Sequence, residues 1–117
     1  MVRKYNAHYD EEFDRLMIAG KSESDVIAGS LRILNLILDF NSENKVVNAE
    51  LLHASEYLKS LNMNVDLLNK ITGGSLSYRA LRNGYEIVFI LEIGEKIVPV
   101  SYNVHLPNQK QILVTSS

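Results

Sequence analysis

Residues 24–40 read SDVIAGSLRILNLILDF, and the fold expected from the sequence depends on how this stretch is interpreted. Large apolar residues recur through it, and from Ile33 to Phe40 they would cover almost the whole circumference of a helix. A helix that is apolar on all sides must be buried on all sides. We therefore expect a helix over about residues 23–40. It would form either the centre of a monomer's core or the interface of a dimer.

The residues before this stretch predict a strand and a first helix. In residues 3–9, RKYNAHY, apolar and polar side chains alternate, which is typical of a short strand with one buried face. The buried face would comprise Tyr5, Ala7 and Tyr9. Residues 10–19, DEEFDRLMIA, predict a helix, because its acids fall in the first turn, where the helix dipole favours them. Gly20 is a natural end for it.

The second half of the chain changes from a helical to a strand-like pattern. Residues 49–61 repeat apolar side chains at helical spacing, and residues 65–71 predict further helical turns. Strands are expected at residues 75–82, 85–93, 97–105 and 110–115, with turns at Asn83-Gly84 and at Gly94-Glu95-Lys96. The predicted class is α+β: an N-terminal strand and helices, followed by a three- to four-stranded antiparallel β-meander. We expect one compact domain over residues 1–117, with sub-parts at 1–45 and 46–117.

Composition excludes several classes of function. The 117 residues contain no cysteine, so disulfides, thiolate zinc sites and cysteine nucleophiles are excluded. Twelve basic residues against 14 acidic ones give a net charge of −2, which argues against binding nucleic acid through bulk positive charge. No apolar run is long enough to span a membrane, and the N-terminus lacks the apolar region of a secretory signal. We expect a cytoplasmic protein that does not enter membranes.

The first 40 residues resemble a known DNA-binding module. The strand at residues 4–9, the acidic start at residues 10–12 and the segment GKSESDVIAGSLRIL at residues 20–34 are similar to the ribbon-helix-helix module of bacterial repressors and antitoxins, the ParD type especially. The resemblance implies a homodimer whose paired N-terminal strands enter the major groove of duplex DNA. Its implied DNA contacts are Arg3, Lys4, Asn6, His8, Ser22 and Ser24. Its implied dimer interface comprises Tyr5, Ala7, Ile27, Leu31, Leu34 and Leu38.

A rival resemblance covers residues 70–105, which look like the sheet of the RelE/ParE-type toxins. Those toxins commonly have an arginine where this chain has Glu86. The resemblance therefore implies a toxin fold that lacks a full catalytic site. A third interpretation is an immunity- or inhibitor-type module that binds another protein, since a mildly acidic chain is suited to a basic partner.

No combination of residues predicts catalysis. His53 and Glu56 lie one helical turn apart and could share a metal, but the chain has only three histidines and no second paired motif. We expect no catalytic residues, no metal and no cofactor. The leading hypothesis is a non-enzymatic, dimeric DNA-binding regulator or antitoxin, whose C-terminal half binds a partner protein.

Overall fold

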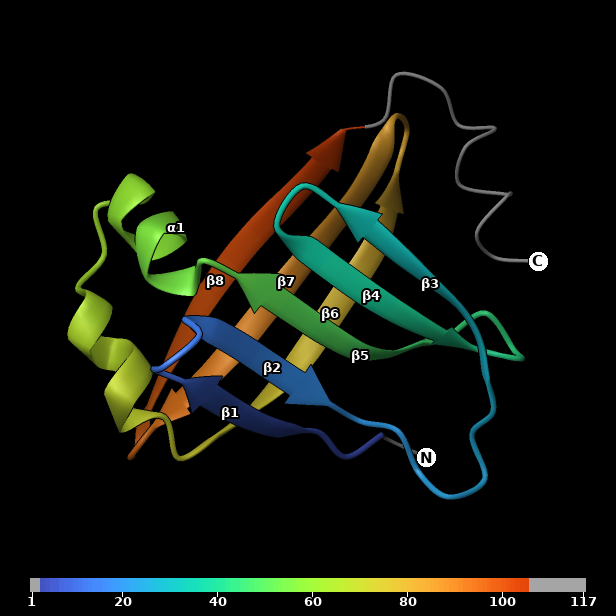
Figure 1. Ribbon diagram of the computed structural model, residues 1–117, viewed down its shortest axis with the longest axis horizontal. Helices are drawn as coiled ribbons and strands as arrows, with labels where there is room; N and C mark the ends of the chain where they lie inside the picture. The colour runs from blue at the N-terminus through green and yellow to red at the C-terminus, as the bar shows by residue number, and fades with distance from the viewer. Residues whose placement is uncertain (1–2, 106–117) are drawn as a thin grey trace.

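A computed structural model describes residues 3–105, which form two antiparallel sheets packed face to face with short helical segments at one end (Figure 1). The five-stranded sheet contains, in spatial order, β1 (Asn6–Asp10), β2 (Arg15–Ala19), β5 (Val46–Leu52), β4 (Leu36–Asn41) and β3 (Ile27–Ile33). The three-stranded sheet contains β6 (Gly73–Leu81), β7 (Gly84–Ile93) and β8 (Lys96–His105). The helical segments are α1 (Ala54–Ser60) and the 3₁₀-helix η1 (Val65–Lys70).

The predicted α+β class is wrong, because the described chain is mostly β. Neither helix expected in the first 40 residues forms. Residues 10–19 make a turn and β2, and residues 24–40 make most of the β3–β4 hairpin. The ribbon-helix-helix resemblance therefore loses the two helices that it implied.

The β3–β4 hairpin explains why residues 24–40 are so apolar. Ile33 pairs with Leu36 around the two-residue turn Leu34-Asn35. The side chains that point into the core alternate along both strands, and they are Leu31, Ile33, Leu36, Leu38 and Phe40. Arg32 and Asp39 lie on the opposite face. This is the period of two that a half-buried strand requires.

β5 occupies the centre of the five-stranded sheet. Leu51 pairs with Leu16 on one side and with Leu36 on the other, and all three side chains are buried. The helix expected over residues 49–61 therefore begins only at Ala54, because residues 49–52 belong to β5.

The predicted meander of residues 75–105 corresponds to the three-stranded sheet. Its two turns are shifted slightly from the expected positions. Leu81 pairs with Gly84, so the first turn is residues 82–83, and Ile93 pairs with Lys96, so the second is residues 94–95. β7 lies in the middle, as its apolar sequence indicates. The strand expected at residues 110–115 lies outside the described residues.

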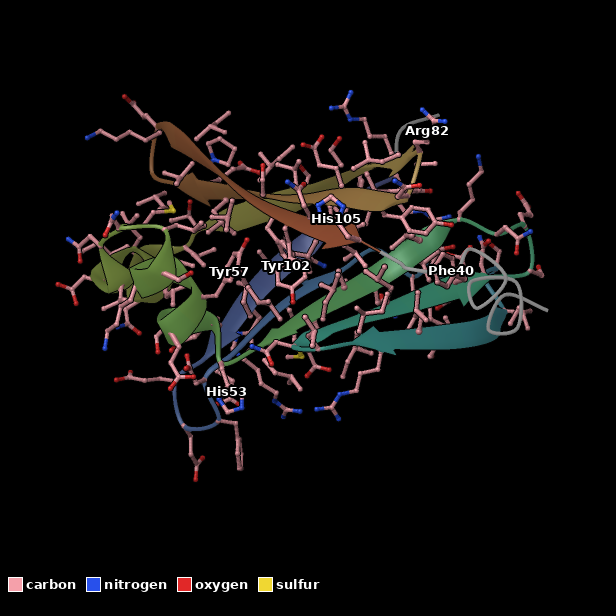
Figure 2. The ribbon with its side chains drawn as sticks, turned by 90° about the horizontal axis from the view of Figure 1, so that it is seen from above. Phe40, His53, Tyr57, Arg82, Tyr102 and His105 are labelled. Carbon is pink, nitrogen blue, oxygen red and sulfur yellow. The ribbon has the colours of Figure 1, made fainter. Side chains whose placement is uncertain are left out.

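The two sheets share one core. Phe89 and Leu91 of β7 and Val100 of β8 belong to the same buried cluster as the leucines of β5 and β4. The sheets approach closely at Gly74, where a Cβ added to the glycine would stand 2.7 Å from the Cβ of Ala7. Figure 2 shows Tyr57 of α1 beside Tyr102 of β8, and their ring centroids are 4.9 Å apart. The helical segments thus close one end of the sandwich.

α1 is capped by a side chain from a distant turn. His53, at its N-cap, has a left-handed backbone and makes no side-chain cap. Asp14, between β1 and β2, replaces it: its carboxylate accepts hydrogen bonds from the backbone N–H of Ser55 (2.9 Å) and from the Ser55 hydroxyl (2.7 Å). The Tyr9 hydroxyl donates a third (2.6 Å). Burial works to raise the pKa of Asp14, but these hydrogen bonds outweigh it and lower the pKa.

We predict that Asp14→Asn lowers the free energy of unfolding by about 1 kcal/mol, because the uncharged amide oxygen accepts the hydrogen bonds of Ser55 and Tyr9 less strongly than the carboxylate does. Because the folded state lowers the pKa of Asp14, its contribution is present above about pH 4 and is lost as the pH falls through the folded pKa. Urea unfolding at pH 7 and at acidic pH should therefore show a smaller difference between wild type and variant in acid. Tyr9, which donates a hydrogen bond to Asp14, has its pKa raised to about 12; burial is the larger cause and this hydrogen bond the next.

A matched control is Glu12→Gln, which removes a charge from the same turn and leaves the cap intact. Equal destabilisation by both variants, or an Asp14→Asn effect that does not change with pH, would contradict the capping role.

Candidate functional site

The outer face of the five-stranded sheet, the side that points away from β6–β8, is the candidate site. Its side chains alternate with those of the core. It comprises Asn6, His8, Arg15, Met17, Ala19, Ser30, Arg32, Ile37, Asp39, Asn48 and Glu50. The strand register places one row of these residues straight across the sheet: His8, Met17, Glu50, Ile37 and Arg32.

A shallow depression lies on this face over β2, β5 and β4. Its volume is about 200 Å³, and Met17, Ala19 and Ile37 give it an apolar lining. Asp39 and Glu50 place two carboxylates on its border. An apolar centre with polar groups around it is the usual composition of a surface that binds another molecule.

Hydrogen bonds hold the Asp39 side of the depression in place. The Asp39 carboxylate accepts one hydrogen bond from the Ser30 hydroxyl (2.6 Å) and one from the Asn48 amide (3.1 Å). These bonds connect β3, β4 and β5 on the outer face. The carboxylate is therefore positioned before any partner arrives, which reduces the entropy cost of binding.

Arg15 holds Glu50 in place on the opposite side of the depression. Its guanidinium lies 3.1 Å from Glu50 and 3.9 Å from Asp10, and it stacks 5.4 Å from the centre of the Phe13 ring. Its Nε is buried and has no hydrogen-bond partner among the described residues. The negative charge of Glu50 is thus partly neutralised by its ion pair with Arg15.

The loop between β2 and β3 is held by a second group of polar residues, the Asp25 cluster, which comprises Arg3, Ser22, Asp25 and Asn41. The Asp25 carboxylate accepts hydrogen bonds from the guanidinium of Arg3 (2.6 Å), the backbone N–H of Ser22 (2.7 Å) and the amide of Asn41 (2.9 Å). The Arg3 bond, followed by the Ser22 and Asn41 bonds, holds the pKa of Asp25 well below its usual range. This carboxylate anchors a loop and is not presented to a ligand.

The structure separates the residues predicted to contact DNA into two groups. Lys4, Asn6 and His8 are exposed, and the alternation predicted for the first strand is confirmed. Arg3 and Ser22 instead meet at Asp25, and Ser24 lies beside Ser22 with its hydroxyl oxygen 3.0 Å away. Ser22 and Ser24 stand in a loop, and no helix begins there to offer its N-terminus to a phosphate.

The residues predicted for a dimer interface also divide. Leu31 and Leu38 are buried in the core of the single chain, and Tyr5 and Ala7 pack against it. Ile27 and Leu34 remain exposed, at opposite ends of β3. Of the six, only these two are free to meet another chain with their side chains.

His53 and Glu56 do not form a metal centre in the described chain. His53 Nδ1 lies 3.7 Å from Glu56, but both side chains are largely exposed. No third histidine, aspartate or glutamate joins them among residues 3–105. Figure 2 shows His53 on the outside of the molecule, on the side of the five-stranded sheet, whereas His105 ends β8 in the other layer.

Sequence reasoning missed the depression because it depends on strand register. Met17, Ile37 and Glu50 are far apart in the chain and become neighbours only when β2, β5 and β4 pair. The available signal was the alternation of residues 36–40 and 46–51, which would have predicted two strands with polar and apolar residues on their second face.

Comparison with known protein families, with curated proteins and with solved structures finds no match for this chain. Within residues 3–105, neither helical segment has the length and apolar character needed to cross a bilayer. The geometry of the outer face is therefore the basis for assigning a function.

Proposed function

We propose that the chain is a non-enzymatic binding protein, and that a partner protein docks on the outer face of its five-stranded sheet. The observation that supports this most directly is the depression lined by Met17 and Ile37 and bordered by Asp39 and Glu50. An apolar side chain of the partner would fill the depression. Basic or amide groups beside it would donate hydrogen bonds to the two carboxylates, in keeping with the net charge of −2.

Asp14 and Asp25, two carboxylates with lowered pKa values, are engaged within the chain. Each accepts several hydrogen bonds from other groups of the chain. A general base requires a lone pair directed at a substrate. Both groups instead direct theirs at the chain itself, so they contribute to stability.

We predict that Met17→Lys combined with Ile37→Lys abolishes docking, because two ammonium groups would occupy the apolar depression. The tagged chain is used to capture proteins from its native cells, and the captured proteins are quantified by mass spectrometry. A partner held by wild type should fall at least about tenfold, since a loss of about 1.4 kcal/mol already has that effect.

The matched control is Leu61→Lys combined with Ile97→Lys, which replaces two exposed apolar residues away from this face. It should retain the partner. Loss of the partner from both double variants, or from neither, would contradict docking on the outer face.

Binding to duplex DNA through β1 is a second candidate. It is supported by the exposure of Asn6 and His8 on this edge strand and of Lys4 just before it. Lysine and asparagine are chemically suited to guanine and adenine respectively. For this candidate, fluorescence anisotropy with a labelled duplex should show an affinity that falls as salt rises from about 50 to about 200 mM, because binding releases counterions from the DNA.

Lys4→Ala combined with Asn6→Ala should remove that binding, whereas Lys96→Ala combined with Asn103→Ala, on the other sheet, should preserve it. Absence of salt-dependent binding by wild type would exclude this candidate and leave the docking of a partner protein unaffected.

A further inference from the structure

β3 forms one edge of the five-stranded sheet, and no described strand lies beyond it (Figure 1). An edge strand leaves N–H and C=O groups of alternate residues directed away from its neighbour, where they can pair with another strand. Residues 29–33 keep a regular register with β4, and the β-bulge lies before them, between Ile27 and Gly29. The middle of this edge is thus straight enough to receive a partner strand.

Exposed apolar side chains stand at both ends of the same edge. Val26 is 65% exposed and Ile27 is 38% exposed at the start of β3, and Leu34 is 78% exposed just beyond its end. Together they are half of the exposed large hydrophobic residues of the described chain. Their position along one strand edge distinguishes them from isolated surface residues, which need no explanation.

Leu34 is unusual in a second way. Its φ is 53°, a left-handed conformation that leucine adopts at a cost of about 1–2 kcal/mol and that glycine or asparagine adopts readily. A leucine in this turn therefore carries both strain and exposed apolar surface. Contact with an apolar surface would remove the cost of exposing the leucine side chain to water.

We propose that the β3 edge is a self-association surface, on which a second copy of the chain pairs its own β3 in antiparallel orientation to form a continuous ten-stranded sheet. With the two-fold axis at Ser30, residues 28–32 of the two strands pair. Beyond the paired residues, Leu34 in the β3–β4 turn of each chain comes next to Val26 and Ile27 of the other, which precede the bulge. The exposed apolar residues at the start of one β3 thus meet the exposed leucine at the end of the other. The same contact occurs at both ends of the interface, as two-fold symmetry requires.

Charge is compatible with the same register. Arg32 is the single charged residue of β3, and it lies opposite Ala28 of the second copy. Ser30 meets its own counterpart at the axis, with each hydroxyl already donating to Asp39 of its chain. No like charges are opposed along the paired strands, so nothing in the register penalises pairing. This interface goes beyond the proposed docking function and does not depend on it.

The test is the oligomeric state of the whole chain, measured by sedimentation equilibrium over a wide range of concentration. Wild type should form a dimer that dissociates on dilution. Val26→Lys combined with Leu34→Lys should be monomeric at all concentrations, because the register places two pairs of like charges in contact. Val26→Lys combined with Leu34→Glu should restore the dimer, because the same contacts then join opposite charges.

The matched control is Leu61→Lys combined with Ile97→Lys, which adds the same charge at exposed apolar positions off the β3 edge. It should dimerise as wild type does. A wild-type chain that is monomeric throughout overturns the proposal. So does a dimer that persists in Val26→Lys with Leu34→Lys, or one that the Leu34→Glu combination fails to restore. Circular dichroism confirms that each variant is folded.

Discussion

Leu51 of β5 lies between Leu16 of β2 and Leu36 of β4, and the register that puts these three leucines in one buried row determines the rest of the structure. Side chains of a strand alternate between faces, so a slip of one residue would move Ala49 and Leu51 of β5 to the solvent side. The same register places Glu50 between Met17 and Ile37 on the other face. The core and the candidate binding surface are therefore two consequences of one pairing.

The sequence predicted the second half of the described chain better than the first, for a physical reason. In residues 75–105 the turns are marked by Asn83-Gly84 and by Gly94, and Gly94 has the positive φ that such turns require. In residues 24–40 the corresponding turn is Leu34-Asn35, and leucine gives no turn signal. An alternating strand would have polar residues at Leu34 and at the outward-facing Ile37, but both are apolar. The stretch therefore also fits the pattern of a helix that is apolar on all sides.

The same ambiguity hid the candidate site. Met17 stands between Leu16 and Ile18, and three apolar residues in succession do not reveal that the middle one faces outward. What could be predicted was the short strand β1, expected at residues 3–9 and observed at Asn6–Asp10, because the tyrosines and alanine of this stretch alternate with polar residues. Residues that act locally are accessible to sequence reasoning. Residues assembled by the pairing of β2, β5 and β4 are not, until the register is known.

The outer face and the β3 edge are physically connected, because β3 borders the face that carries the depression. Pairing two chains along β3 would continue the outer face across the two-fold axis and present two depressions on one sheet. A partner that contacts both would gain affinity through the high effective concentration of the second site, without any additional contact in either depression.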